Sequence, residues 1–198
     1  MKNIIKMDEF MHKSIWYKNL LENPTEIAAL FPCSTETCKL MTAHLEGMDE
    51  GYILELGSGM GAITECILQR QAPEDKLILI EKNEDFADYL SHKYRNATVF
   101  AEDASNAKKL LQAQGIYEVR HIVCSLPLVI MQQEQQLSIL DVIFELLHPQ
   151  GCVSIVTYFV RCPISKKVLD RYNKSSKLFG FTMRNIPPAY VYQIKSSH

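Results

Sequence analysis

One short stretch constrains the fold of this chain more than any other: residues 53–64, ILELGSGMGAIT. Four residues with a strand-like pattern run into glycines at positions 57, 59 and 61, and a helix-like pattern follows. Glycine adopts positive φ at little cost and leaves the backbone bare, so alternating glycines allow a tight turn against which a ligand can lie. The stretch predicts a strand–turn–helix unit, which is either a ligand site or a plain tight connection.

The spacing of these glycines does not match two common phosphate sites. A dinucleotide fingerprint has the form G-x-G-x-x-G, but here Ala62 occupies the last position and Gly61 comes one residue early. The chain also contains no G-x-x-x-x-G-K-[S/T] loop. We therefore expect neither a pyrophosphate cradle of the dinucleotide type nor a nucleoside triphosphate loop.

Beyond residue 50, short apolar segments alternate with segments of helical pattern. The expected strands are Tyr52–Leu56, Lys76–Glu81, Thr98–Ala101, Val119–Ser125 and Cys152–Tyr158. The expected helices are Ala62–Gln71, Glu84–Tyr94, Ala104–Ala113, Gln133–Leu147 and 164–178. Such alternation is typical of an α/β fold, in which a mostly parallel sheet has helices on both faces.

The C-terminal end departs from this alternation. Two further strands, Phe181–Asn185 and Tyr190–Lys195, are separated by a pair of prolines and not by a helix. Two strands joined by such a short connection pair antiparallel. We therefore expect one antiparallel strand at the end of the sheet.

Residues 1–50 precede the sheet and have a helical pattern. One helix is expected over Ile4–Glu22, and a second begins after Pro32 with Ser34 as its N-cap. At 198 residues the chain fits a single domain. We expect residues 1–50 to form a helical lid or membrane-contact segment, and residues 51–198 to form the α/β part.

Composition favours a cytoplasmic protein. The first twenty residues lack the apolar core of a secretory signal, and no run of about 18 apolar residues could span a membrane. The six cysteines form no C-x-x-C pair, and the histidines show no metal-ligand spacing. We therefore expect reduced cysteines and no metal site.

Two acidic residues follow predicted strands at the edge where the glycine turn lies. Glu81 closes the second strand, where a carboxylate can accept both hydroxyls of a ribose. Asp103 follows the third strand, where it can accept from the amine of a purine while the N–H of Ala104 donates to the ring. Simpler roles stay open: a helix N-terminal charge for Glu81 and an N-cap for Asp103. The pattern predicts a nucleoside site in one crevice.

The order of these features resembles the class I S-adenosylmethionine-dependent methyltransferases over residues 50–160. That family implies a Rossmann-like, seven-stranded, mostly parallel sheet with an antiparallel last strand. It also implies S-adenosylmethionine as cofactor and S-adenosylhomocysteine as product. The cofactor contacts that the resemblance implies are Ser34, Glu55, Gly57, Ser58, Gly59, Gly61, Glu81, Lys82, Glu102, Asp103, Ala104 and Ser125.

A finer resemblance covers nearly the full chain. The stretches at residues 29–34, 125–128, 156–158 and 185–192 resemble the bacterial phospholipid N-methyltransferases, which methylate phosphatidylethanolamine. One departure is Cys33, where that family has a small serine. The reaction site implied by the resemblance is formed by Ser125, Leu126, Pro127 and Tyr158. Plainer roles stay open for two of them, a turn residue for Ser125 and a packed strand-end tyrosine for Tyr158.

Two other functions stay open. RNA adenine dimethyltransferases share the general pattern but have an Asn-x-Pro-aromatic loop after the fourth strand. Here Ser125 replaces the asparagine and Leu128 replaces the aromatic that would stack on a flipped base. This departure argues against nucleic acid as a partner, although a basic C-terminal segment fits one. The other alternative is a non-catalytic cofactor-binding scaffold.

Charge is distributed unevenly along the chain. The net charge is −2, yet residues 161–198 contain eight Lys and Arg and a single acid. The predicted N-terminal helix has a second apolar edge formed by Ile5, Trp16 and Leu20, with lysines beside it. Both features suit peripheral attachment to an anionic membrane surface, although a solvated basic helix or a dimer contact would also explain them. We expect a phospholipid substrate and a monomer or weak homodimer.

Overall fold

The computed structural model describes residues 33–46, 51–185 and 187–197. The helix predicted over Ile4–Glu22 lies outside the described residues, so the N-terminal lid stays a prediction. Helix α3 (Thr35–Thr42) begins after Ser34, whose hydroxyl accepts a hydrogen bond from the Thr37 N–H at 3.2 Å. The predicted N-cap is confirmed. Among the described residues, no helix is both long enough and apolar enough to cross a bilayer.

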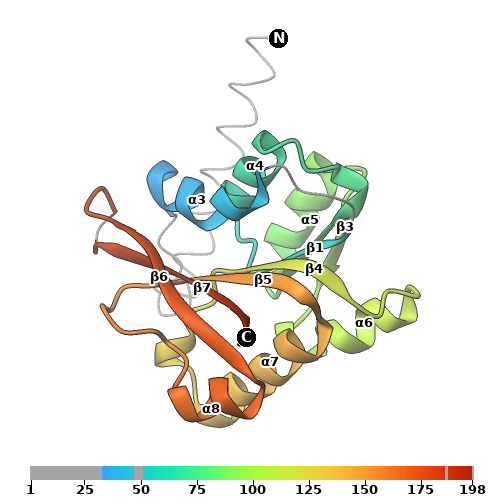
Figure 1. The fold of residues 1–198 in the computed structure, drawn as a ribbon. Coiled ribbons are helices and arrows are strands. Elements are labelled where there is room, and N and C mark those ends of the chain that lie inside the picture. Colours follow the sequence, from blue (N-terminus) through green and yellow to red (C-terminus); the bar gives the residue numbers. More distant parts are fainter. Residues whose placement is uncertain (1–32, 47–50, 186, 198) are drawn as a thin grey trace.

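Seven strands form one sheet in the order β3-β2-β1-β4-β5-β7-β6 (Figure 1). The strands are β1 (Ile53–Leu56), β2 (Leu77–Glu81), β3 (Thr98–Ala101), β4 (Val119–Cys124), β5 (Leu147–Thr157), β6 (Lys174–Thr182) and β7 (Ala189–Ser196). Strands β1 to β5 pair parallel, and β7 runs antiparallel to both of its neighbours, β5 and β6. The predicted sheet with an antiparallel last strand is confirmed.

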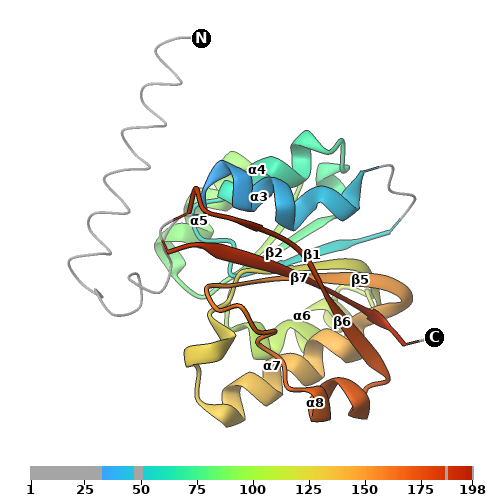
Figure 2. The ribbon, with the colours of Figure 1, turned by 60° about the vertical axis from the view of Figure 1, so that its left-hand side comes forward.

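Helices cover both faces of the sheet (Figure 2). On one face lie α3, α4 (Ala62–Gln69) and α5 (Glu84–Lys93), and on the other lie α6 (Ala107–Ala113), α7 (Gln133–Leu146) and α8 (Lys166–Arg171). Each face has its own cluster of buried apolar side chains. Strands β1 and β2 are buried over their whole length, which explains why their sequences do not alternate and are apolar except at Glu55 and Glu81.

The helix predicted over 164–178 is wrong in its second half. Helix α8 ends at Arg171, and Asn173 adopts a left-handed conformation with φ of 51°. Asparagine tolerates this conformation, which ends a helix. The residues from Lys174 onward form strand β6 along β7, so the strand expected at Phe181–Asn185 starts earlier and ends at Thr182. The basic residues of this segment are therefore divided between a short helix and an edge strand.

Two other element boundaries differ from the predictions. Strand β5 begins at Leu147, directly after α7, because Leu147 pairs with Val119 before a register shift restores pairing at Cys152. The helix expected from Ala104 begins as the 3₁₀ turn η3 (Ala104–Asn106). The other short turns are η1 (Ala43–Leu45), η2 (Glu74–Lys76) and η4 (Leu128–Ile130).

Two neighbouring histidines, His44 beside the sheet and His121 in β4, each have a buried ring nitrogen without a hydrogen-bond partner. The ring centroids of His44 and His121 are 5.0 Å apart, and Nδ1 of His44 lies 3.0 Å from the Ser154 hydroxyl. Nε2 of His44 and Nδ1 of His121 are buried without a partner. Burial, reinforced by nearby positive charge, lowers the pKa of His44 to about 3 and the pKa of His121 to about 4. Both rings are therefore neutral in the folded protein near pH 7.

We predict that these histidines make the fold sensitive to acid. Their folded-state pKa values lie below the ordinary value of 6.5, so the unfolded chain binds more protons as the pH falls through that value. By linkage, His44 alone should remove about 2 kcal/mol of unfolding free energy between neutral pH and about pH 5. Urea unfolding over this range measures the loss. The variant His44→Gln cannot titrate and should flatten the dependence; an unchanged pH slope would contradict the prediction.

Candidate active site

The glycine turn after β1 is built from three residues with positive φ. The φ angles of Gly57, Gly59 and Gly61 are 76°, 53° and 84°. A Cβ atom added to Gly57 would lie 2.8 Å from Cδ2 of Leu126, whereas one added to Gly59 would meet no atom within 4 Å. Gly57 is therefore required by packing inside the protein, and Gly59 borders open space.

The carboxylate of Glu81 is fixed against this turn. Its two oxygens accept hydrogen bonds from the N–H of Gly59 at 2.7 Å and from the N–H of Asn83 at 2.9 Å. Burial raises the pKa of Glu81, while these backbone N–H groups act in the opposite direction. The acid predicted to bind a ribose thus lies at the end of β2, directly beside the glycine backbone.

Glu55 and Ser58 bring unpaired polar atoms to the same region. The Glu55 side chain is fully buried, and one of its oxygens accepts from the Thr64 hydroxyl at 2.8 Å. Its other oxygen and the buried hydroxyl of Ser58 have no hydrogen-bond partner. Burial raises the pKa of Glu55 to about 8. Because buried polar atoms in native proteins are usually paired, these two mark where a polar ligand group or water belongs.

The second predicted acid, Asp103, lies in the segment after β3. Asp103 caps η3, and its Oδ1 accepts from the Ser105 N–H at 2.9 Å and from the Ser105 hydroxyl at 2.7 Å. Partial burial opposes ionisation of Asp103, but these hydrogen bonds and the charge of Lys82 outweigh it and lower its pKa. The N-cap role of Asp103 is therefore real and leaves its Oδ2 for another partner. Glu102 accepts from the Asp103 N–H at 3.0 Å, and Ala104 is buried.

The loop after β4 closes over the glycine turn. The Ser125 hydroxyl donates to the carbonyl of Gly57 at 2.6 Å, so this side chain fixes the turn. Pro127 forms a tight turn in which the carbonyl of Leu126 accepts from the Leu128 N–H at 2.8 Å. The carbonyl of Pro127 accepts from the Ile130 N–H at 3.0 Å. The loop is therefore rigid, and each of these two carbonyls retains a second lone pair.

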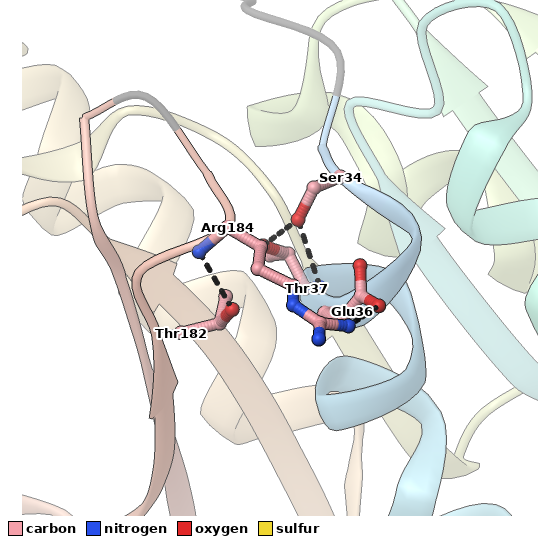
Figure 3. A network of polar contacts seen from close by, with 5 residues as sticks. All are labelled: Ser34, Glu36, Thr37, Thr182 and Arg184. Carbon is pink, nitrogen blue, oxygen red and sulfur yellow. Dashed lines mark hydrogen bonds and ion pairs between the residues drawn. The ribbon is translucent and has the colours of Figure 1, made fainter.

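A polar network joins the start of α3 to the segment between β6 and β7. The buried side chain of Asn185 accepts from the Ser34 N–H at 2.9 Å and from the Thr37 hydroxyl at 3.2 Å. Beside it, the Arg184 guanidinium lies 2.9 Å from the Glu36 carboxylate (Figure 3). These contacts attach the N-cap of α3 to the C-terminal half of the sheet.

Tyr158 connects this network to the end of β5. Burial and the nearby Cys33 thiol raise the pKa of Tyr158 to about 12, while a hydrogen bond with the Asn185 side chain acts in the opposite direction. Cys33 also contributes to the raised pKa of Glu55. The phenol of Tyr158 is therefore neutral near pH 7.

Most of the predicted site residues follow strands whose carboxyl ends share one edge of the sheet, as expected for ligand sites in α/β folds. Lys82 differs, because its side chain is exposed and acts only through its charge on Asp103. Sequence reasoning assigned no role to Thr37, Thr64 or Asn185. The polar Asn185 directly before Ile-Pro-Pro is the one local signal that could have drawn attention to that position.

Comparison with known proteins indicates which cofactor and which type of reaction the site resembles. The chain is 29% identical over 171 residues to the ornithine lipid N-methyltransferase of Singulisphaera acidiphila, a match that covers 85% of this chain and 88% of that protein. The fold matches the magnesium protoporphyrin IX methyltransferase of Synechocystis PCC 6803, solved with bound S-adenosylmethionine, with a TM-score of 0.65 at 12% identity over 94% of this chain and 97% of that one. The chain thus has the fold of S-adenosylmethionine-dependent methyltransferases, and its sequence is similar to that of a lipid N-methyltransferase along most of its length.

A second relative matches only part of the chain. The ribosomal RNA small subunit methyltransferase A of a Hydrogenobaculum species is 41% identical over 61 residues, which cover 31% of this chain and 23% of that protein. No family model matches the chain. The two relatives thus differ in the acceptor that their names give, an ornithine lipid and a ribosomal RNA.

The residues around the turn fit S-adenosylmethionine. The open space at Gly59 leaves room for a ligand against the backbone, and the unpaired oxygen of Glu55 suits the ammonium of the cofactor's amino-acid end. The unpaired hydroxyl of Ser58 lies in the same turn and can pair with the polar atoms of that end. Glu81 and Asp103 offer carboxylate oxygens for the ribose and the adenine.

Alanine at Gly57 and at Gly59 should separate packing from cofactor binding. Gly59→Ala places its methyl in open space at a left-handed φ, at a cost of about 1 kcal/mol, and should fold. We expect it to lose about tenfold or more in affinity for S-adenosylmethionine, which corresponds to about 1.4 kcal/mol. Gly57→Ala overpacks against Leu126 and should lose about 2 kcal/mol of stability. Calorimetric titration and thermal unfolding measure both; normal affinity in folded Gly59→Ala would refute the cofactor site.

Glu55→Gln should stabilise the cofactor-free protein while weakening cofactor binding. Because the pKa of Glu55 is raised to about 8 from 4.5, its carboxyl destabilises the fold increasingly as the pH rises between these values. Glutamine can still accept from Thr64 but buries no charge, so we expect a gain of about 2 kcal/mol near pH 8. Unfolding at several pH values measures the gain, with the exposed Glu84→Gln as control. Equal stability of Glu55→Gln and wild type at pH 8 would contradict this account.

Proposed function

We propose that this protein is an S-adenosylmethionine-dependent methyltransferase that transfers methyl groups to the primary amine of a membrane lipid, with phosphatidylethanolamine as the substrate to test first. The observation that carries the proposal is the match to an ornithine lipid N-methyltransferase along most of both chains. Similarity to the phospholipid N-methyltransferases in the segments that surround the reaction site supports it. An amine-bearing lipid head group is the chemistry common to both.

Cofactor binding is proposed for the residues around the glycine turn. Glu81 would accept from the ribose hydroxyls, and Asp103 would accept from the adenine amine through its Oδ2. Glu55 and Ser58 would pair with the amino-acid end, where a positive ammonium would lower the raised pKa of Glu55 and favour its charged form. Ser125 acts through the carbonyl of Gly57, so its proposed role is to position the turn.

When bound, the cofactor supplies an electrophilic methyl group on a sulfonium. The chain's own residues must hold a neutral amine roughly 3 Å from that carbon and in line with the bond that breaks. The backbone carbonyls of Leu126 and Pro127 can accept from the amine through their second lone pairs. Tyr158 is neutral at physiological pH, so we propose that its hydroxyl orients the amine by a hydrogen bond and does not act as a base.

RNA adenine methylation is the second candidate, supported by the partial match to a ribosomal RNA methyltransferase. One observation argues against it. Position 128, where that family has its base-stacking aromatic, is a leucine whose side chain is 1% exposed and belongs to the hydrophobic core. A side chain packed there has no free face on which a flipped base could stack. The third alternative, a non-catalytic scaffold, predicts cofactor binding without transfer to any acceptor.

The proposed lipid substrate also implies a location. An enzyme that acts on a lipid head group must reach the membrane surface, and the described residues contain no helix that could span it. We therefore propose peripheral attachment to the cytoplasmic face of the membrane. The enrichment of Lys and Arg in residues 161–198 supports attraction to anionic lipids.

Labelled cofactor should transfer its methyl group to phosphatidylethanolamine in vesicles. Lipid extraction and chromatography detect the product, and parallel reactions with an ornithine-containing lipid, structured RNA and a small amine compare the acceptors. Tyr158→Phe should reduce turnover by about tenfold, a typical loss for one orienting hydrogen bond, while cofactor affinity stays unchanged. Tyr117→Phe, at the opposite edge of the sheet, is the matched control.

Each outcome assigns the acceptor. Labelled ornithine lipid without labelled phosphatidylethanolamine would keep the lipid class and reject the specific lipid. Labelled RNA, with salt-sensitive RNA binding, would replace the proposal by its alternative. Cofactor binding with no labelled acceptor would favour the scaffold.

A further inference from the structure

Exposed apolar side chains gather at three loops on the active-site edge. Nine large apolar side chains are exposed among the described residues; five lie in these loops and a sixth, Phe181, lies at the end of β6, each between 45% and 69% exposed. We refer to these six residues as the apolar rim: Val129, Ile130, Phe159, Val160, Phe181 and Met183. They follow β4 and β5 and lie around the end of β6.

The three loops are neighbours in space. Because β5 and β6 both run antiparallel to β7, they are parallel to each other and end at the same edge as β4. Figures 1 and 2 show the loops after β4 and β5 and the β6–β7 turn along one side of the molecule. This is the edge on which the amine acceptor must enter.

Hydrogen bonds and a ring contact connect the three loops to one another and to the sheet. The side-chain amide of Gln136 donates to the carbonyl of Leu128 at 3.0 Å and to the carbonyl of Pro163 at 3.3 Å, so it joins the first two loops. The Tyr192 hydroxyl donates to the carbonyl of Val160, which ties the second loop to β7. The rings of Phe181 and Tyr190 stack with centroids 5.9 Å apart. The rim is therefore held outward by a rigid support.

The charge of the same region favours an anionic surface. Of the seven Lys and Arg in residues 159–185, two flank the rim, whereas the other five lie in α8 and along β6. Arg161 is exposed beside Val160, and Arg184 next to Met183 is exposed although it is paired with Glu36. Two copies of this chain that met symmetrically through the rim would bring these cations against each other, so the charge opposes a dimer at this face.

We propose that the apolar rim inserts into the head-group and acyl-chain boundary of an anionic membrane leaflet, with Arg161 and Arg184 at the head groups. This inference rests on the proposed lipid substrate for its purpose: insertion would turn the mouth of the site toward the leaflet, so that a lipid amine could enter without leaving the membrane. Apolar side chains flanked by cations are the combination that binds such boundaries. The rim replaces the basic helix predicted over 164–178 as the membrane contact of the C-terminal half.

Single-tryptophan reporters test the orientation directly. Trp16 is the only tryptophan in the chain, so Phe181→Trp in a Trp16→Phe background reports on the rim alone. The matched reporter is Tyr117→Trp, because Tyr117 is exposed at the amino-terminal end of β4. The vesicles contain phosphatidylglycerol and phosphatidylcholine brominated on their acyl chains, and therefore no primary amine.

We expect the bromolipids to quench the rim reporter about twofold, as for a side chain at the acyl-chain boundary, and to leave the Tyr117 reporter unquenched. Vesicle binding without quenching of the rim reporter, or equal quenching of both reporters, would overturn the proposal. An oligomer in sedimentation velocity that dissociates when Phe181 and Met183 become serine would also overturn it, in favour of a dimer.

A second variant tests the rim by measuring how the protein partitions between water and vesicles. Ile130→Ser combined with Phe181→Ser and Met183→Ser should lower the vesicle partition coefficient by at least about tenfold, given the apolar area removed, while Tyr117→Ser should not. Calorimetric binding of S-adenosylmethionine confirms that the triple variant is folded, and wild-type partition in a folded triple variant would overturn the proposal. Because these vesicles lack a primary amine, they test insertion alone. Quenching of the rim reporter in them, together with no methyl transfer to amine-bearing lipid in the separate acceptor assay, would refute the proposed substrate and leave the rim standing.

Discussion

Hydrogen bonds with residues at the ends of both neighbouring strands, β2 and β4, fix the backbone of the glycine turn after β1. The rest of the site depends on these two hydrogen bonds. The Ser125 hydroxyl, which follows β4, donates to the carbonyl of Gly57 at 2.6 Å. From the other side, the Glu81 carboxylate at the end of β2 accepts from the N–H of Gly59 at 2.7 Å. A Cβ atom at Gly57 would lie 2.8 Å from Cδ2 of Leu126, so this packing requires glycine at that position. Because β1 lies between β2 and β4, the turn fixes the positions of both Glu81, proposed to bind the ribose, and the loop 125–128, proposed to hold the methyl acceptor.

The same turn carries a cost that a ligand can offset. Glu55 is fully buried with one unpaired oxygen, and Ser58 has a buried hydroxyl with no partner. Such groups destabilise a fold that holds no ligand, and they persist where a ligand pairs with them. Burial raises the pKa of Glu55, so its carboxyl group favours the neutral form in the absence of a ligand. A neighbouring cation would lower this pKa and favour the charged form.

We propose that the residues that select the methyl acceptor lie at the edge of the sheet and not in the shared part of the fold. The magnesium protoporphyrin IX methyltransferase of Synechocystis PCC 6803 has the same fold at 12% identity, so the sheet alone does not select an acceptor. In this chain the N-cap of α3 and the segment after β6 meet at Asn185, and Tyr158 joins them from β5. The apolar rim lies on the same side of the sheet, so we infer that substrate access and membrane contact share one surface.

The sequence by itself determined what depends on neighbouring residues: the glycine turn, the alternation of strands and helices, and the Ser34 cap, because spacing and turn chemistry are local. It also indicated the order of acids along the crevice. Only the tertiary structure decided that residues after Asn173 form an edge strand, because pairing with β7 outweighs a weak helical pattern. It also decided the contact between Ser34 and Asn185, which are 151 residues apart in the sequence, since no local pattern records a hydrogen bond that forms only when distant strands pack together.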